Sequence, residues 1–172
     1  MTISPVAYTI GYEGWELDEF VARLREQRVE VLIDIREKPA SRKPGFSKTP
    51  LREALEEAGI EYVHVKALGS PSAIRYEYKN GGDKETFFKA YRAYLKTQGA
   101  HLRTVLDAVR EKTCCLMCLE RHAWECHRST VSDMLKELDG NGLRVIHLER
   151  HIGIDQERAG EHQGLLGWAT PI

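Results

Sequence analysis

The segment from Cys118 to Arg128 combines thiol, carboxylate, imidazole and guanidinium groups within a few residues. A short apolar run precedes it and a helical repeat of apolar residues follows it, which predicts a loop between a strand and a helix. In parallel sheets such loops lie at the carboxyl ends of the strands, where ligands bind. Arg128 and the free N–H groups of a helix that begins near His127 would attract an anion. The segment therefore predicts a phosphate-binding loop.

Carboxylates are the groups most expected to carry chemistry here. Glu120 comes just after the predicted strand, where partial burial and a nearby arginine would tune its pKa for proton transfer. Glu13 is a second candidate acid or base, and Asp34 would orient a hydroxyl group or a partner side chain. Cys126 stands where a helix start lowers a thiol pKa, so it is a candidate nucleophile, although bracing or capping the loop is the commoner function of such a residue.

Two other loops supply groups that could contact the same ligand. The glycines after the first strand allow a tight turn, but their Gly-x-x-Gly spacing is not the dinucleotide fingerprint. The loop 36–48 has five basic residues and one acidic residue, and its Phe46 ring could stack on a base. Asp34 and Arg36 could contact the ligand or simply pair with each other. The residues expected to contact the ligand are Gly11, Tyr12, Arg36, Arg42, Lys43, Phe46, Cys118, His127 and Arg128.

A zinc site is the alternative that the cysteines suggest. Cys115 and Cys118 have Cys-x-x-Cys spacing and could join Cys126 and His127 as four ligands. Residues three apart in a strand point to opposite faces, however, so Cys115 and Cys118 would diverge. We therefore expect no structural metal ion and no cofactor.

The elements that position these loops alternate between strand and helix, which predicts a single three-layer α/β domain with a mainly parallel sheet flanked by helices. Residues 1–148 form this predicted domain, and 149–172 are expected to be a tail or docking arm. With a net charge of −1, the chain has no overall attraction for nucleic acid or membrane. Neither a targeting segment nor a membrane span is evident, so a cytoplasmic location is expected.

Five motifs in a fixed order resemble a known family. They are Tyr8 to Gly14, the strand end Asp34 to Arg36, Ser41 to Lys48, Tyr62 to Pro71, and Cys118-x-Glu120 followed by Cys126 to Ser129. Together they resemble the prokaryotic proteins grouped as domain of unknown function 488, over about residues 8–148. The resemblance implies a small α/β domain and implies little about activity.

The leading hypothesis is an enzyme that hydrolyses, or transfers a group from, a small phosphorylated molecule such as a nucleotide, or a nucleic-acid end. Arg36, Arg42 and Arg128 would hold anionic oxygens beside the catalytic carboxylates. A non-catalytic nucleotide or nucleic-acid binding module is a second hypothesis, and a thiol redox or zinc protein is a third. No membrane partner is expected.

Overall fold

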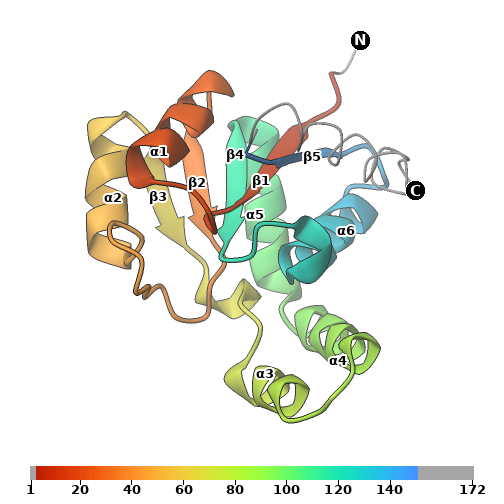
Figure 1. Ribbon diagram of the computed structural model, residues 1–172. Helices are drawn as coiled ribbons and strands as arrows, with labels where there is room; N and C mark the ends of the chain where they lie inside the picture. Colours follow the sequence, from red (N-terminus) through yellow and green to blue (C-terminus); the bar gives the residue numbers. More distant parts are fainter. Residues whose placement is uncertain (1–2, 151–172) are drawn as a thin grey trace, which may run out of the picture.

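The computed structural model describes residues 3–150, which form a five-stranded parallel sheet with helices on both faces (Figure 1). The strands are β1 (Val6–Gly11), β2 (Val31–Asp34), β3 (Glu61–His64), β4 (Cys114–Cys118) and β5 (Arg144–Leu148). The α-helices are α1 (Leu17–Glu26), α2 (Lys48–Glu57), α3 (Ser72–Lys79), α4 (Lys84–Lys96), α5 (Gly99–Glu111) and α6 (Arg128–Leu138). Short 3₁₀ turns lie at η1 (Lys66–Leu68) and η2 (Ala123–Glu125). The predicted α/β architecture is confirmed.

Two separate cores hold the helices against the sheet. On one face, buried residues of α1 and α2 such as Phe20 and Leu51 pack against Cys115 of β4. On the other face, buried residues of α5 and α6 pack against Cys114 and Cys118 of the same strand. The alternation along β4 therefore places Cys115 and Cys118 on opposite faces, as the sequence predicts.

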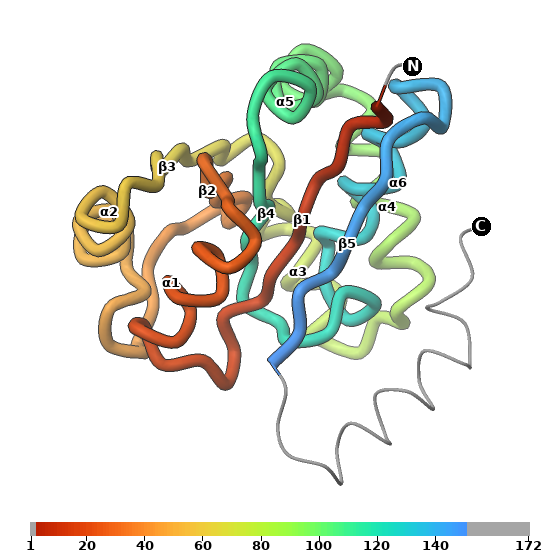
Figure 2. Tube along the Cα trace, turned by 90° about the horizontal axis from the view of Figure 1, so that it is seen from above, coloured from red at the N-terminus to blue at the C-terminus, as the bar shows by residue number. Residues whose placement is uncertain are grey.

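The strand order β3-β2-β4-β1-β5 creates a switch point between β1 and β4, which are hydrogen-bonded neighbours (Figure 2). The chain leaves β1 toward α1 on one face of the sheet and leaves β4 toward α6 on the other. Two adjacent loops that depart in opposite directions leave a crevice at the carboxyl edge, which is where open α/β sheets bind ligands. The loops after β1 and β4 that contain the candidate residues both lie there.

Helix α3 was not predicted, and with α4 it lies beyond the carboxyl edge of the sheet rather than on either face (Figure 1). The sequence before the apolar stripe of α4 predicts Asp83 as its N-cap, and this is confirmed, since its Oδ1 accepts a hydrogen bond of 2.8 Å from the Thr86 amide. For α2 the sequence Thr49-Pro50 predicts Thr49 as the N-cap, and this is wrong. That helix begins at Lys48 after Ser47, so Thr49 lies inside the first turn instead of capping it.

The predicted tail falls almost entirely outside the described residues, which end at Arg150. Arg150 itself forms an ion pair of 2.9 Å with Glu19 at the start of α1. Within residues 3–150, no helix is both long and apolar enough to cross a membrane.

A candidate ligand-binding cleft at the carboxyl edge of the sheet

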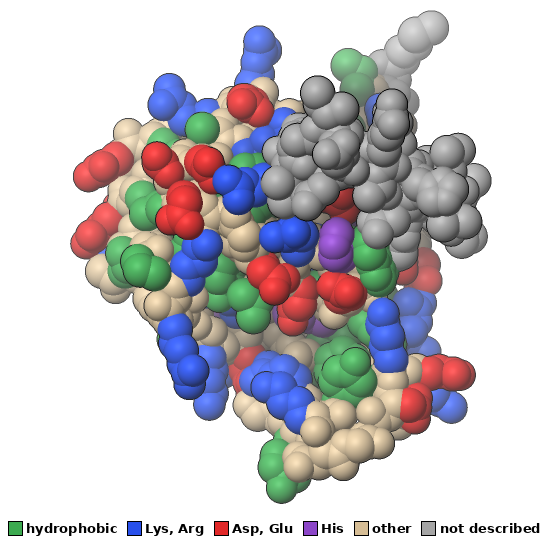
Figure 3. Space-filling model, viewed as in Figure 1, with side chains coloured by type: hydrophobic (Ala, Val, Ile, Leu, Met, Phe, Trp, Pro, Cys, Tyr) green, Lys and Arg blue, Asp and Glu red, His purple; other side chains and the backbone are tan. Residues whose placement is uncertain are grey.

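A cleft of about 520 Å³ lies between the carboxyl edge of the sheet and the α3–α4 pair. Tyr12, Arg36 and Glu120, which follow β1, β2 and β4, line its sheet side, and His127 lines it beside the start of α6. Helices α3 and α4 supply its outer wall. Figure 3 shows this face of the molecule hollowed above the two helices, with basic and acidic side chains around the hollow. The volume is in the range of sites for small organic ligands.

The cleft has more basic than acidic side chains. Its lining includes Arg36, Lys38, Arg75, Lys79 and Lys84, against Glu37, Glu120 and Glu125. Two of the cations have partners, because Arg36 pairs with Asp34 and Arg75 pairs with Glu37. The three lysines form no ion pair with any carboxylate that the structure describes. These three ammonium groups remain available to an anionic ligand.

Glu37, on the cleft wall, occupies the start of α3. Its carboxylate accepts hydrogen bonds from the amide and the hydroxyl of Ser72, the latter at 2.6 Å, and pairs with Arg75. Burial opposes ionisation of this carboxyl group, yet these hydrogen bonds outweigh it and lower the Glu37 pKa. The helix start beside the cleft is thus already filled by an anionic group of the chain itself.

The loop after β1 is held by backbone hydrogen bonds to the loop after β4. The Tyr12 amide donates to the Cys118 carbonyl at 3.1 Å, and the Glu13 amide donates to the Leu119 carbonyl at 2.9 Å. The exposed Glu13 side chain accepts from the Arg121 amide at 3.0 Å. Glu13 therefore braces the two loops, and it does not line the cleft with Tyr12.

Asp34 and Arg36, which the sequence left open as ligand contacts or mutual partners, pair with each other. The buried carboxylate of Asp34 accepts from the Arg36 Nε at 2.9 Å and Nη2 at 2.7 Å. The Tyr62 hydroxyl donates a hydrogen bond to the same carboxylate at 2.6 Å. The hydroxyl that Asp34 orients therefore belongs to the neighbouring strand β3 and not to a ligand. Burial opposes the charge on Arg36, while Asp34 raises the Arg36 pKa above its usual value. The pair supports the cleft floor beneath Tyr12, whose ring lies 5.2 Å from the guanidinium carbon.

Phe46 does not provide the exposed ring that the sequence predicted, and this is a correction. Its side chain is fully buried, stacked on Tyr12 with ring centroids 4.7 Å apart and packed edge-on against Phe20 at 5.2 Å. Its backbone carbonyl accepts from the Arg36 Nη1 at 2.8 Å. The Phe46 ring is part of the core although the loop around it is polar, so it cannot stack on a base.

The remaining cations of the same loop lie apart from the cleft. Arg42 is exposed, and the Lys43 ammonium group is 3.6 Å from the Glu16 carboxylate before α1. Neither residue lines the cleft. Of the five basic residues of this loop, only Arg36 and Lys38 line the cleft, so the loop contributes less to an anion site than its composition indicates.

Arg128 is a second correction, because two of its guanidinium nitrogens donate to the protein backbone instead of a ligand. The side chain is completely buried at the start of α6. Its Nη1 donates to the Glu120 carbonyl at 2.8 Å, and its Nη2 donates to the Arg121 carbonyl at 2.9 Å. Burial lowers the Arg128 pKa to about 10. Arg128 holds the loop after β4 in place and does not line the cleft.

Cys118 and Cys126 meet beside this arginine, where the structure joins their sulfur atoms as a disulfide. The Cys126 sulfur also accepts a hydrogen bond from the Arg128 amide at 3.4 Å. This contact caps the start of α6, one of the two functions that the sequence suggests for Cys126. His127 donates from Nε2 to the Ile35 carbonyl at 3.2 Å, and its Nδ1 lies 3.6 Å from the Cys126 sulfur. Burial lowers the His127 pKa to about 4, so the ring is neutral near pH 7.

Glu120 is the candidate catalytic carboxyl group that does line the cleft. Its Oε2 is buried and has no hydrogen-bond partner among the described residues. Burial raises the Glu120 pKa. An unpartnered carboxyl oxygen is costly to bury, so this group is poised to take a ligand, a proton or an ion.

The outer wall of the cleft was not predicted from the sequence. Helix α3 contributes Arg75, Tyr78 and Lys79, and the start of α4 contributes Lys84, Phe87 and Phe88. The only signal was the predicted α4 itself, because α3 is a short helix of 8 residues, none of which is buried.

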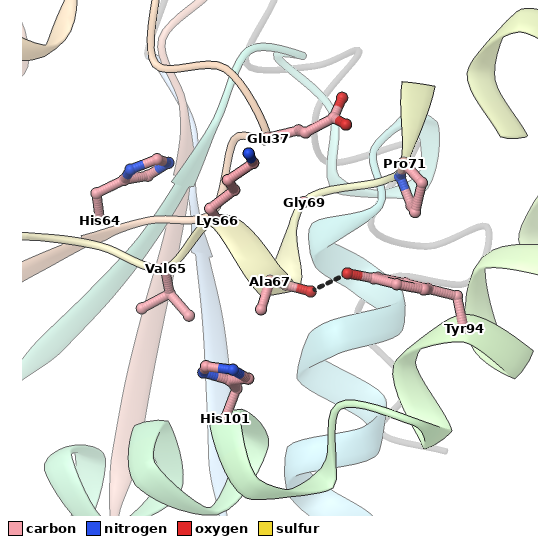
Figure 4. Close-up of a pocket in the computed structure, with 9 residues that line it drawn as sticks. All are labelled: Glu37, His64, Val65, Lys66, Ala67, Gly69, Pro71, Tyr94 and His101. Atoms are coloured by element: carbon pink, nitrogen blue, oxygen red, sulfur yellow. Dashed lines mark hydrogen bonds between the residues drawn. The ribbon is translucent and has the colours of Figure 1, made fainter. Parts of the chain in front are cut away.

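A second cavity, of about 530 Å³, lies on the far side of Glu37 (Figure 4). Its lining includes His64 at the end of β3, Tyr94 of α4 and His101 of α5, and the Tyr94 hydroxyl donates to the Ala67 carbonyl at 2.8 Å. His64 donates from Nε2 to the Arg36 carbonyl at 2.7 Å. None of the candidate residues predicted from the sequence lines this cavity, so the cleft above α3 and α4 is the better candidate site.

A family model described as domain of unknown function DUF488 matches residues 16–135. The chain belongs to this family. The match runs from the loop before α1 into α6 and includes the loops after β2 and β4 that line the cleft. The resemblance noted from the five motifs is thereby confirmed. No curated protein and no solved structure matches the chain, so any function of this DUF488 protein has to be argued from the cleft itself.

Proposed function

We propose that the cleft binds a phosphate-bearing ligand, a nucleotide or a nucleic-acid end, and that the protein hydrolyses this ligand or transfers a group from it. The observation that carries the proposal is the set of Lys38, Lys79 and Lys84 around one cleft, without ion-pair partners among the described residues. Three ammonium groups that converge on a concave site match the charge of a phosphate better than that of a neutral metabolite.

The aromatic side chains of the same wall favour a ligand that also has a base. Tyr78 is 43% exposed, and its ring lies 5.1 Å from that of Phe87, which in turn contacts Phe88 at 5.2 Å. Phe88 also lies under the Lys84 ammonium group, 5.8 Å from it. A base stacked on these rings would place its phosphate among the lysines. The rings of α3 and α4 thus take the function that the sequence analysis assigned to Phe46.

Glu120 is the group of the cleft that could take part in the reaction. It faces the ligand space from the end of β4, opposite the lysines of α3 and α4, and its Oε2 has no partner within the described residues. The other carboxylates that were candidates, Glu13 and Asp34, are engaged with Arg121 and Arg36. Chemistry at the cleft therefore centres on Glu120.

Titration calorimetry with the full chain tests the binding proposal. The probes are AMP, ADP, a 5′-phosphorylated dinucleotide, inorganic phosphate and adenosine. We expect the phosphorylated compounds to bind and adenosine to bind at least tenfold more weakly. The double substitution Lys79→Ala and Lys84→Ala should weaken binding by about tenfold or more, since a hydrogen bond to a charged group contributes roughly 1.5–3 kcal/mol.

Lys96→Ala is the matched control, because this exposed lysine lies at the other end of α4 and does not line the cleft. Its affinity for each probe should equal that of the wild type. Equal losses in Lys96→Ala and in the double variant would show general charge attraction and overturn the site. Binding without turnover of any probe would support the phosphate site and favour the non-catalytic binding module.

A further inference from the structure

Cys118, Glu120 and Cys126 bring three metal-ligand atoms together at the base of the loop after β4. The two sulfur atoms and a carboxylate oxygen all lie within 4.8 Å of one another. We propose that, in the reduced protein, these three residues bind one divalent metal ion of the zinc class. This site stands whether or not the cleft binds a nucleotide.

The ligand types suit a borderline-soft ion. Two thiolates with a carboxylate are a set that zinc accepts in tetrahedral sites, whereas calcium and magnesium require oxygen ligands. Cys115, whose direction made a Cys-x-x-Cys zinc site unfavourable, lies on the opposite face of β4 and is not part of this site. Cys118 and Cys126 both belong to the core on the α6 side.

The backbone separation of the two cysteines favours a shared ion over a permanent disulfide. Their Cα atoms are 7.3 Å apart. Disulfides usually join Cα atoms about 4.4–6.8 Å apart, and a longer separation requires the backbone to move. Two cysteines that bind one ion need no direct bond between their sulfur atoms, so they tolerate the wider spacing.

Glu120 supplies an independent indication of a missing ligand. Its buried Oε2 has no hydrogen-bond partner in the described part of the chain. Buried carboxyl oxygens are rarely left without a partner, because the loss of hydration is not compensated. An ion held between this carboxylate and the two sulfur atoms would compensate it.

Arg128 completes the charge balance and the outer shell of hydrogen bonds. Its Nη1 lies 3.2 Å from the Cys118 sulfur, and its backbone amide lies 3.4 Å from the Cys126 sulfur. Both are donors aimed at atoms that become thiolates when a metal binds, as outer-shell groups of metal sites are. A dication with two thiolates and one carboxylate has a net charge of −1. The buried guanidinium, which has no carboxylate within ion-pair distance in residues 3–150, would neutralise it.

Glu120 also lines the cleft, so an ion that it binds would lie beside the ligand space. His127 is not counted as a ligand, since it does not belong to the group whose ligand atoms all lie within 4.8 Å of one another. A site with three protein ligands and one open position is the arrangement of catalytic zinc. Glu120 would then act in the cleft as a ligand of the ion rather than as a free acid.

Metal binding requires the dithiol form of the protein. A dithiol reductant supplies two electrons and two protons to the Cys118–Cys126 bond and becomes a disulfide itself, and the two thiols formed release their protons as the ion binds. The disulfide and the metal complex are thus mutually exclusive states of the same pair. Zinc content should therefore rise under reducing conditions.

Cobalt titration of the reduced full chain tests the site. Co²⁺ bound to thiolates gives a near-ultraviolet charge-transfer band, and strong visible absorption if it is tetrahedral. We expect one Co²⁺ per chain, displaced by one Zn²⁺, and one zinc per chain by elemental analysis after purification under reducing conditions without chelator. Cys126→Ala should abolish the charge-transfer band or reduce it to a weakly bound remnant. Glu120→Gln should keep the band but weaken Zn²⁺ affinity at least tenfold in competition with a chromophoric chelator.

Cys115→Ala is the matched control, since this buried cysteine of the same strand lies on the opposite face, and its band and affinity should be those of the wild type. Circular dichroism separates loss of metal from loss of fold, and Glu120→Gln keeps the proposal testable if Cys126→Ala unfolds. Two reactive thiols in the reduced, folded protein with no cobalt band at equimolar Co²⁺ would overturn the proposal and leave a redox pair. An unchanged Zn²⁺ affinity in Glu120→Gln would also overturn the three-residue site.

Discussion

The carbonyl oxygen of Glu120 lies 1.6 Å from the point where a Cβ atom at Gly11 would stand. The Arg128 Nη1 lies 2.5 Å from the same point. The loop after β4 thus packs directly on the backbone of β1, and glycine is required at position 11 for this approach. Gly11 was expected from the sequence to contact the ligand, whereas in the structure its lack of a side chain makes room for the loop that contains Glu120.

Gly11→Ala is therefore expected to lower the free energy of unfolding by about 3 kcal/mol, the upper end of the range for overpacking, because backbone rather than a flexible side chain must move. Urea denaturation measures this change. Gly99→Ala is the control, since the nearest atom to its added Cβ is the mobile Arg103 guanidinium at 3.4 Å, and it should be as stable as the wild type or slightly more so. Equal stability of the two variants would contradict the close approach.

The buried Asp34–Arg36 pair gives a second prediction. Asp34→Asn keeps the shape of the side chain but leaves the Arg36 guanidinium buried without its counter-charge, so we expect a loss of about 3 kcal/mol of stability. Tyr62→Phe removes only one hydrogen bond to the same carboxylate and should cost about 1 kcal/mol. The comparison is made by urea denaturation at pH 7. If Asp34→Asn were no more damaging than Tyr62→Phe, the pair would not hold the cleft floor.

The sequence predicted the strands and most helices well because each depends on a local pattern. The apolar run of β4 and the apolar stripe of α5 are buried as expected. Helix α3 was missed because it has only 8 residues and none of them is buried, so it contributes no run of core residues to the pattern. The start of α2 was misplaced because Ser47 and Thr49 are both good caps, and the Ser47 hydroxyl bonds to the Ser41 carbonyl instead.

The candidate site was predicted less completely, since its contacts join distant segments. The motif around Glu120 was placed correctly beside the loop after β1, because parallel strand ends share one edge. Arg128 and Phe46 were assigned to the ligand from their chemistry alone, and both turned out to be buried. Whether a side chain faces a ligand or the core depends on packing across the sheet, which neither spacing nor residue type reveals.

His147 on β5 gives a pH prediction. Burial, with smaller effects of Arg128 and Lys136, lowers its pKa to about 4, and its Nδ1 lies 2.6 Å from the Thr9 hydroxyl. The unfolded chain takes up this proton near pH 6.5, before the folded protein does, so stability falls as pH drops from about 6.5 to about 4. His147→Gln, which cannot titrate, should lose up to about 2 kcal/mol less than the wild type between pH 7 and pH 4.5. Parallel pH dependences for the two proteins would show that His147 titrates normally.

Phe46 and Phe88 allow a test of where a base stacks. The sequence favours Phe46 for this function, and the structure favours Phe88. Phe46→Leu shortens a ring packed between Tyr12 and Phe20, so it should cost about 1 kcal/mol of stability and leave nucleotide affinity unchanged. Phe88→Leu removes a partly exposed ring from the cleft wall and should weaken AMP binding by about tenfold, in line with roughly 1–3 kcal/mol for stacking on one base. Inorganic phosphate, which has no base, should bind both variants as it binds the wild type.

Calorimetric titration of each variant with AMP and with phosphate gives the comparison. Weaker AMP binding by Phe46→Leu, with Phe88→Leu unaffected, would show that the base stacks on the loop 36–48. It would contradict the proposal that the base stacks on the cleft wall formed by α3 and α4.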